Sequence, residues 1–401
     1  MLGRLFSHLQ NLNSIPARRF WAIVQALTSQ FAIPITRILL SLTVVRWYSE
    51  VYWGTYVQYL LVVQLCATLI NLGSRDFLLR NYSRSPDNIK NVLVASMLGR
   101  GGIAVVVVII IGLLPWGALD RSILVFWLLA QLSWQFFEAL NVYRRLFWQS
   151  AVIELLIVLL LIALFLTQPL TLTTFLWCMA VAELIKGLIY WLLNRHYISW
   201  KIVDSTQVVD FLKAAFPFLV LVLAGAGASR GELYLLALKM DAAALGKYQV
   251  LSSFVQSSHL LASAVLLPFI KNVYRLKAGV LFKIERNFLA FGLLLSPLLA
   301  LMIYALLHYA YAFELCILIY CLTGTLIFLY FFQVIRIQML FRQNQVQRVS
   351  LILIMMGAIK ILGGWWLIPK LGISGALIAA VLAYIAGNVA FWQVRIKSLA
   401  Q

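Results

Sequence analysis

Charged residues are scarce in this sequence, and acidic residues are the scarcest. Only 11% of the 401 residues are charged and only 13 are Asp or Glu, whereas about 25% of a typical soluble domain is charged. No stretch is both long enough and polar enough to form a separate soluble domain. Because 63% of the residues are hydrophobic, the sequence excludes a soluble fold and indicates a chain that lies in lipid.

Cysteine is rare, and the motifs of cofactor chemistry are absent from the sequence. The four cysteines lie in apolar stretches, without metal-ligand spacing and without the pattern of a secreted disulfide framework. We interpret them as small buried apolar side chains. No glycine-rich phosphate loop or nucleophile motif is present, so we expect no cofactor, no metal site and no enzymatic activity.

Long apolar stretches fill almost the whole chain. A helix that spans a bilayer needs about 20 mostly apolar residues, and short polar turns separate stretches of that length. They cover approximately residues 20–45, 52–73, 91–115, 122–143, 148–167, 171–193, 211–238, 243–270, 287–312, 313–335, 348–368 and 372–394. The predicted fold class is therefore an all-α integral membrane protein with about 12 transmembrane helices.

Basic residues alternate in number from one loop to the next. The loops of one set hold 22 Lys and Arg residues, and the loops of the opposite set hold five. This alternation follows the positive-inside rule, so it predicts an even number of spans with both termini in the cytoplasm. The same rule accounts for most of the net charge of +19, so we expect membrane lipids, and no nucleic acid, as partners.

The two halves of the chain resemble each other. A shift of 192 residues pairs Gly54 with Gly246 and Gln64 with Gln256 in corresponding spans, which is typical of a duplicated transporter unit. We therefore predict two pseudo-symmetric six-helix lobes around a central cavity. The predicted parts are an N-terminal interfacial segment (1–19), an N-lobe with spans 1–6 (20–195), a cytoplasmic amphipathic linker (196–210) and a C-lobe with spans 7–12 (211–401).

Nine charged residues lie inside the predicted spans. They are Arg37, Arg100, Lys186, Arg230, Lys360, Glu138, Glu154, Glu183 and Glu232. Each costs about 2.5–3.5 kcal/mol at a helix centre on an insertion scale, so most must face a wet cavity, pair with one another or reach a helix end. Glu183 and Lys186 are three residues apart on one helix, and we expect these two to pair.

Polar residues form one-sided stripes on four of the predicted spans. With helical spacing, the stripes are Gln30, Pro34, Arg37 and Ser41; Gln64, Thr68 and Asn71; Gln131, Gln135 and Glu138; and Ser252, Gln256, His259 and Ser263. Such stripes either join helices through hydrogen bonds or line a water-filled cavity. Four stripes, two of them with a buried Arg or Glu, favour the cavity.

Two arginines, Arg37 and Arg230, take nearly corresponding places in the two halves. A guanidinium donates two parallel hydrogen bonds and stays charged, so this pair suits an anion such as a phosphate. The alternative is an internal ion pair with Glu138 or Glu232. The predicted residues of the substrate cavity are Arg37, Arg230, Gln64, Gln256, Arg100 and Lys360.

Two acidic residues are candidates for coupling transport to an ion gradient. Glu138 can take up a proton when its site closes and loses water. The alternative for Glu138 is a permanent salt bridge to a neighbouring Arg. The other candidate is Glu232, two residues after Arg230.

Short motifs in three places resemble the signatures of a known family. They are Trp53-Gly54-Thr55-Tyr56 running on to Asn71-Leu72-Gly73, Arg230-Gly231-Glu232-Leu233-Tyr234 followed by Leu245-Gly246-Lys247-Tyr248, and Leu371-Gly372-Ile373-Ser374-Gly375-Ala376. They are similar to motifs of the multidrug/oligosaccharidyl-lipid/polysaccharide (MOP) exporter superfamily, in its Wzx-type branch of lipid-linked oligosaccharide and polysaccharide flippases. Members of this family often have Asp where this chain has Glu232.

This resemblance implies a secondary transporter in the bacterial cytoplasmic (inner) membrane. Its implied cargo is an undecaprenyl-pyrophosphate-linked glycan, the repeat unit of an O-antigen or exopolysaccharide, moved by alternating access that H⁺ or Na⁺ drives. The resemblance also implies phosphate contacts at Arg37 and Arg230. A polymerase and a chain-length regulator of the same polysaccharide biosynthesis pathway are the implied partners.

Two other functions are compatible with a polytopic membrane chain. A glycan polymerase or membrane glycosyltransferase usually needs a sizeable extracytoplasmic loop with catalytic groups, but every loop predicted on that side is short. A multidrug/cation antiporter of the same superfamily needs an excess of acidic groups in its cavity. The intramembrane residues, five basic and four acidic, favour an anionic cargo instead.

Overall fold

The computed structural model of the protein describes residues 31–32, 34–168, 170–198, 204–275, 278–343 and 345–394. Within these ranges the chain forms helices joined by short turns, and it has no strand. This confirms the predicted all-α class, which follows from the need of each spanning segment to pair its own backbone groups in lipid. The predicted interfacial segment 1–19 and Gln30 lie outside the described ranges.

The N-lobe begins with a helix over residues 34–47. It continues with α3 (Glu50–Asn71), α4 (Ser74–Arg84), α5 (Ile89–Leu113), α6 (Ala118–Gln135), α7 (Glu138–Tyr143), α8 (Phe147–Thr167) and α9 (Leu172–Asn194), and with 3-10 turns at Pro86–Asn88 and Arg195–Tyr197. The short, polar α4 is not one of the predicted spans. α6 and α7 together occupy the fourth predicted span, with a turn at Phe136 and Phe137 between them.

The C-lobe contains α10 (Ser205–Lys239), α11 (Ala242–Arg275), α12 (Ala278–Ala305), α13 (Ile317–Arg342) and α14 (Val346–Gln393), with a π-helical turn at Leu306–Ala310. A capping residue explains where α10 begins, and a glycine explains where α14 bends. The carboxylate of Asp204 caps α10 by accepting from the backbone N–H of Thr206 at 3.3 Å, and hydrogen bonds from Thr206 hold the pKa of this carboxyl below its usual value. α14 bends at Gly372, whose φ of 55° and ψ of −130° suit only glycine.

Within the described ranges every predicted span therefore coincides with a helix, since the helix over residues 34–47 lies in the described part of the first span and the two halves of α14 form the eleventh and twelfth spans. Among the described helices, nine are long and apolar enough to cross a membrane when α14 is taken as one. Leucines such as Leu160 on α8 and Leu294 on α12 are exposed, as expected of helix faces that lipid rather than protein covers. The chain is a multi-pass membrane protein.

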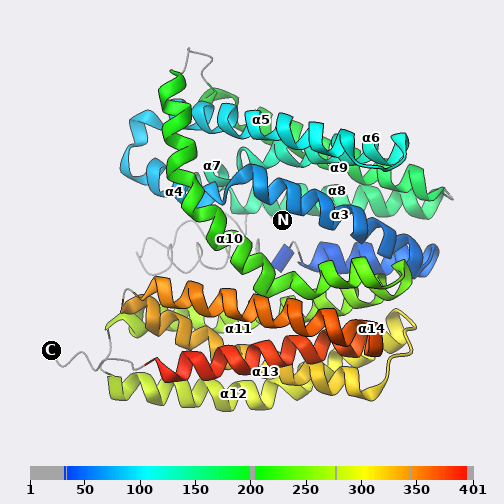
Figure 1. The fold of residues 1–401 in the computed structure, drawn as a ribbon, viewed down its shortest axis with the longest axis vertical. Coiled ribbons are helices and arrows are strands. Elements are labelled where there is room, and N and C mark those ends of the chain that lie inside the picture. Colours follow the sequence, from blue (N-terminus) through cyan, green and yellow to red (C-terminus); the bar gives the residue numbers. More distant parts are fainter. Residues whose placement is uncertain are drawn as a thin grey trace, which may run out of the picture.

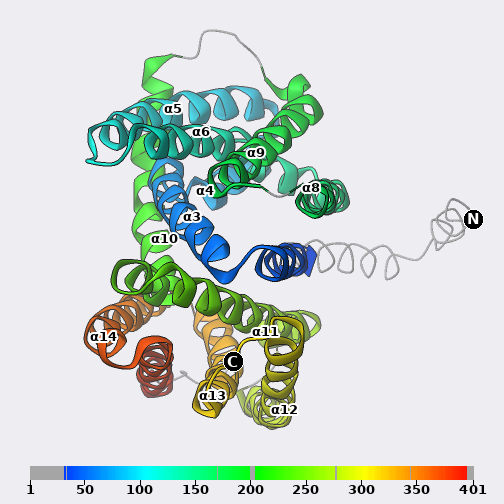
Figure 2. The same ribbon diagram turned by 90° about the vertical axis from the view of Figure 1, so that its right-hand side faces the viewer.

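The helices assemble into two lobes (Figures 1 and 2). α6 packs on α9 and α3 in the N-lobe, whereas α13 packs on α12 and α14 in the C-lobe. α10 contacts both lobes as it crosses the molecule in Figure 1. Its first half contacts α4 and α5, and its second half packs along α14.

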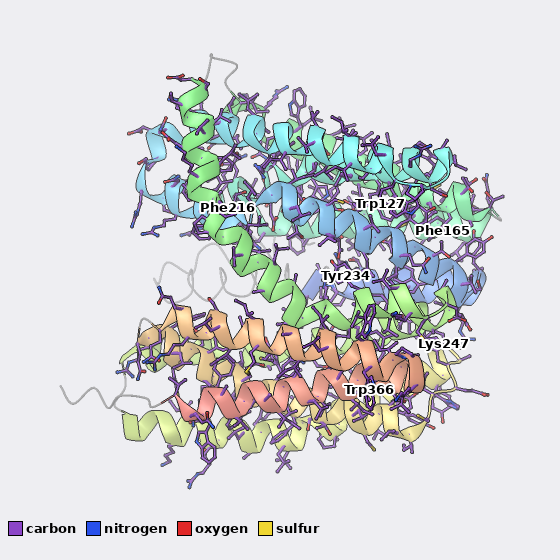
Figure 3. The ribbon with its side chains drawn as sticks, viewed as in Figure 1. Trp127, Phe165, Phe216, Tyr234, Lys247 and Trp366 are labelled. Carbon is purple, nitrogen blue, oxygen red and sulfur yellow. The ribbon has the colours of Figure 1, made fainter. Side chains whose placement is uncertain are left out.

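The lobes approach each other most closely where α3 crosses α11 near the start of both helices. A Cβ atom on Gly54 of α3 would fall 2.5 Å from the carbonyl carbon of Ala242, and one on Gly246 of α11 would fall 3.1 Å from the backbone nitrogen of Gly54. The two glycines that the sequence repeat pairs thus allow the lobes to touch, backbone against backbone. Beside them, Nζ of Lys247 (labelled in Figure 3) lies 3.0 Å from Oε1 of Glu50.

The first helix adds contacts with the C-lobe at the same end of the bundle. Nη2 of Arg46 donates to the carbonyl oxygen of Tyr309 at 2.6 Å, and its Nε donates to that of Ala310. The hydroxyls of Ser41 and Tyr311 lie 2.7 Å apart. We call this region, with the α3–α11 crossing, the closed end; the basic loops of the predicted cytoplasmic set lie at the opposite end.

Candidate functional site

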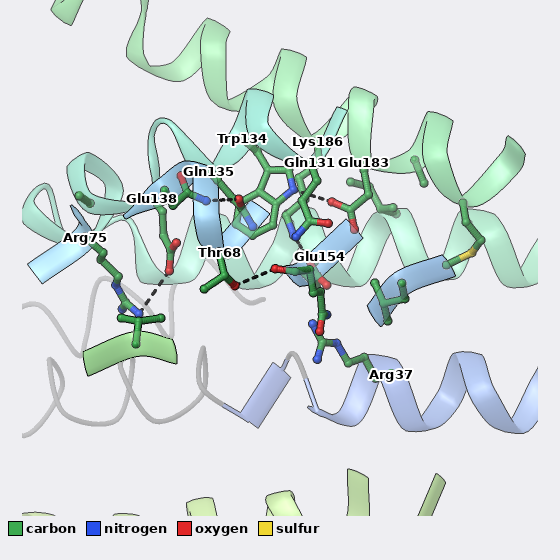
Figure 4. A pocket seen from close by; sticks show the side chains of 18 of the residues that line it. Arg37, Thr68, Arg75, Gln131, Trp134, Gln135, Glu138, Glu154, Glu183 and Lys186 are labelled. Carbon is green, nitrogen blue, oxygen red and sulfur yellow. Dashed lines mark hydrogen bonds and ion pairs between the residues drawn. The ribbon is translucent and has the colours of Figure 1, made fainter. Parts of the chain in front are cut away.

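A polar cavity of about 510 Å³ lies within the N-lobe and against α10 (Figure 4). Its polar lining comprises Arg37, Gln64, Thr68, Asn71, Ser74, Arg75, Arg100, Gln131, Gln135, Glu138, Glu154, Glu183, Lys186 and Arg230, with Tyr56 and Trp134 beside them. The stripes predicted on α3 and on α6–α7 both face this space. We call it the arginine cavity, because both predicted anion-binding arginines line it.

Arg37 and Arg230 bring one guanidinium from each lobe into the arginine cavity. Nη1 of Arg230 donates to Oε1 of Gln64 at 2.6 Å, which links α10 to α3. Arg37 makes no hydrogen bond and no ion pair with any residue in the described part of the chain. The alternative of an ion pair with Glu138 or Glu232 is therefore not observed, and the donors of Arg37 are available to a ligand.

Glu138 lies at the rim of the cavity, with Oε1 3.3 Å from Nη1 of Arg75 (Figure 4). The side chain of Glu138 is 38% exposed and that of Arg75 is 54% exposed. Water therefore reaches both groups, and such a pair contributes about 0–1 kcal/mol. The salt bridge to a neighbouring Arg, which was the alternative for Glu138, is the arrangement that the structure shows.

Arg100 is almost completely buried, and its donors are occupied by the protein. It donates to the carbonyl and hydroxyl oxygens of Ser96 and to Oδ1 of Asn71, each at 3.1 Å, and to the carbonyls of Gln135 and Phe136 at 3.5 Å. The break between α6 and α7 frees these two carbonyls from helical bonding. Because all five guanidinium donors are used, Arg100 stabilises the break and has none left for a ligand.

Glu154, Glu183 and Lys186 form a cluster on the wall of the arginine cavity near Arg37. Nζ of Lys186 lies 2.6 Å from Oε2 of Glu154 on α8 and 4.0 Å from the centre of the Trp134 ring. Nε1 of Trp134 donates to Oε2 of Glu183 at 2.6 Å. The expected Glu183–Lys186 pair does not form a direct ion pair, although the two groups attract each other. Lys186 instead pairs with Glu154 on the neighbouring helix, and Trp134 donates to the Glu183 carboxylate.

Glu232 and Lys360 form a second, separate site inside the C-lobe. Nζ of Lys360 lies 3.1 and 3.2 Å from the two carboxylate oxygens of Glu232, and the Tyr248 hydroxyl donates to Glu232 at 3.3 Å. A cavity of about 40 Å³ adjoins this pair and is also lined by Gln256 and His259. The predicted substrate-cavity set is thus divided, because Lys360 and Gln256 do not line the arginine cavity.

Several residues of the arginine cavity were not predicted from the sequence, among them Arg75 and Trp134. Arg75 is one of the 22 basic residues in the loops predicted to be cytoplasmic, although it follows the Asn71-Leu72-Gly73 turn that ends a polar stripe. Trp134 stands three residues after Gln131, and that spacing places both on one helix face. With Arg75 included, the lining contains five basic and three acidic residues, so the cavity suits a polar ligand with negative charge.

Comparison with known proteins gives matches in structure but not in sequence. No protein-family model and no curated protein matches the chain. A solved structure of the lipid II flippase MurJ in an inward closed conformation superposes with a TM-score of 0.70 at 13% identity, over 92% of this chain and 86% of that chain.

Transporters of the MOP superfamily give further structural matches. The eukaryotic MATE transporter AtDTX14 superposes with a TM-score of 0.55 at 9% identity, over 93% of each chain. A MOP superfamily transporter from Pyrococcus furiosus, described with a binding pocket of reversed polarity, gives 0.52 at 14% identity, over 95% of this chain and 96% of that one. This chain therefore has the 12-helix, two-lobe fold of these proteins, as predicted.

Proposed function

We propose that this protein is a secondary transporter of the MOP superfamily that moves a polyprenyl-pyrophosphate-linked oligosaccharide across the cytoplasmic membrane by ion-coupled alternating access. The observation that carries the proposal is a cavity with one guanidinium from each lobe, of which Arg37 has no partner among the described residues. The lining has an excess of two basic residues. A diphosphate diester, with about one negative charge on each phosphorus, balances that excess.

Repulsion between the two arginines also favours binding of an anion in the cavity. Arg37 and Arg230 are close enough to repel each other, and like charges in a poorly solvated cavity cost free energy. A diphosphate between them removes this repulsion and accepts their hydrogen bonds, of which charge-assisted ones are the strongest. Gln64 orients Arg230 for this contact through the bond at 2.6 Å. A protein named as a lipid II flippase, MurJ, has the same fold.

The charge alternation of the loops gives the orientation that we propose. The basic loops face the cytoplasm, so both termini are cytoplasmic and the closed end faces outward. The described state is then shut toward the outside. Residues 20–195 and 211–401 act as the two lobes, and residues 196–210 connect them, with α10 already beginning at Ser205 inside this connection.

Substitution of the two arginines tests the proposed function directly. Removing a charge-assisted contact costs about 1.5–3 kcal/mol, so Arg37→Ala and Arg230→Ala should each weaken binding of a short-chain prenyl-diphosphate-N-acetylglucosamine diester about 10- to 150-fold. Arg121→Ala is the matched control, because Arg121 contacts the carbonyl of Gly112 far from the cavity. In cells, the double variant should insert normally and abolish surface glycan; normal glycan would refute the proposal.

A multidrug/cation antiporter is the second candidate, because the fold is shared with MATE transporters. The two functions differ in the sign of the cargo. A cation antiporter would bind ethidium in the arginine cavity, and removal of Arg37 would leave that binding unchanged or strengthen it by lowering the local positive charge. The proposed flippase should bind the diester and not ethidium. Either function leaves the cargo chemically unchanged, unlike a polymerase or glycosyltransferase.

A further inference from the structure

Glu183 of α9 stands out among the acidic residues of the arginine cavity, because it forms no ion pair with any residue that the structure describes. Its only hydrogen bond among the described residues comes from Nε1 of Trp134. Glu154 pairs with Lys186 at 2.6 Å, and Glu138 pairs with Arg75 at 3.3 Å. Glu183 is half-buried, so water compensates only in part for the missing partner.

Arg37 acts as a counter-charge for Glu154 and Glu183, although it forms an ion pair with neither. Arg37 is near enough to interact electrostatically with Glu154 and Glu183, and in Figure 4 its guanidinium lies next to Glu154. Arg37 and Lys186 therefore offset the charges of Glu154 and Glu183 while the cavity is empty. Lys186 is the larger counter-charge at Glu183 and Arg37 the smaller. Because Lys186 also pairs with Glu154, one ammonium serves two carboxylates, and their charges are balanced only while Arg37, which forms no ion pair among the described residues, contributes as well.

We propose that Glu183 is a proton-binding site coupled to cargo: it takes up a proton from water when an anionic headgroup binds Arg37. This inference rests on the proposed function. Once the diphosphate occupies Arg37, it withdraws the counter-charge from Glu183 and adds negative charge to the same cavity. Both changes favour the neutral carboxyl. The step moves one proton from water to a carboxylate oxygen and breaks no other covalent bond.

The other groups that face Glu183 do not replace it in this role. From α3, the Tyr56 hydroxyl carries no charge, and from α6 Trp134 and Gln131 are neutral. Glu154, from α8, keeps the ammonium of Lys186 whether or not Arg37 is drawn away. Of the residues that the structure describes, no histidine lines the arginine cavity, so a carboxyl group is the one left to titrate near neutral pH.

The coupling is measured with purified protein and the short-chain prenyl-diphosphate-N-acetylglucosamine diester, which has no group that titrates between about pH 5.5 and 8. By linkage, uptake of about one proton tightens binding up to about tenfold for each unit by which the pH falls. Calorimetry in buffers of different ionisation enthalpy counts the same proton. Glu183→Gln should bind the diester, release or take up no proton, and show a flat pH profile.

Two further variants separate this role from a structural one. Glu138→Gln should keep the pH profile of the wild type, since the carboxyl group of Glu138 is not the proton acceptor. Trp134→Phe keeps the carboxyl group and removes its hydrogen-bond donor. Because that bond favours the charged form, the variant should take up the proton at higher pH, a readout that does not require Glu183→Gln to fold.

The outcomes distinguish this inference from the proposed function. If the wild type binds the diester and Glu183→Gln keeps its proton uptake, or if Glu138→Gln loses it instead, the inference is overturned while the proposed function stands. If Trp134→Phe titrates like the wild type, Glu183 is again not the acceptor. If the wild type fails to bind the diester at any pH, the proposed function falls and takes this inference with it.

Discussion

The glycine crossing between the lobes should control how tightly the closed end shuts. In Gly54→Ala, the new Cβ would overlap the carbonyl oxygen of Ala242 and lie 2.5 Å from its carbonyl carbon, so α3 and α11 must separate by about 2 Å to reach normal contact distance. Overpacking of this kind costs about 1–3 kcal/mol. The cost applies only to the state in which the two helices cross, so it shifts the population toward an open outer end by about 5- to 150-fold.

The rate at which a thiol inside the outer end is labelled measures this shift. Ser253 lines a small cavity beside Trp53, just inside the crossing, so Ser253→Cys in a background without the four natural cysteines reports on access. A membrane-impermeant maleimide added outside the cell should label this thiol about 5- to 150-fold faster in Gly54→Ala than in its absence. Gly112→Ala is the matched control, because no atom lies within 4 Å of its new Cβ. Equal labelling rates in the Gly54→Ala and Gly112→Ala backgrounds would refute the reasoning.

Three further predictions concern stability, each followed by thermal unfolding in detergent. Lys360→Met should lower the free energy of unfolding by about 3–5 kcal/mol, because it leaves Glu232 buried without a counter-charge. The double variant with Glu232→Gln should recover most of this loss. A double variant as unstable as the single one would contradict the prediction. Arg100→Met should lower the free energy of unfolding by about 1–3 kcal/mol for each buried carbonyl that it leaves unpaired at the α6–α7 break. A variant as stable as the wild type would show that Arg100 does not support the break. Gly372→Ala should cost about 1–3 kcal/mol through its positive φ, unlike Gly102→Ala, whose Cβ meets open space; a similar loss in both would remove the role assigned to the bend in α14.

The sequence predicted the spans well because the bilayer imposes a simple rule on each segment separately. A stretch of about 20 apolar residues becomes a helix whatever surrounds it, and all the predicted stretches coincide with helices in the described ranges. The repeat was informative for a similar reason. Gly54 and Gly246 mark equivalent places in the two halves, and the structure brings these places together at the closed end.

The candidate site was predicted only in part. The stripes on α3 and α6 correctly placed Gln64 and Glu138 along a polar cavity, and they lie there with Arg37 and Arg230. The stripe on α11 was expected to join them, but Gln256 lines the small C-lobe cavity instead. Helical periodicity tells which face of a helix is polar, but it does not tell which other helix that face meets.

The sequence by itself thus determined that this is a helical membrane protein in two related halves, with polar residues on defined helix faces. Only the tertiary structure decided how the buried charges are paired. Lys186 pairs with Glu154 rather than with Glu183 on its own helix, and Lys360 pairs with Glu232 at a separation of 128 residues. The physical reason is that an ion pair depends on distances between side chains of different helices, and packing sets those distances. Packing likewise left Arg37 without a partner among the described residues, and the proposed function rests on these unused hydrogen-bond donors.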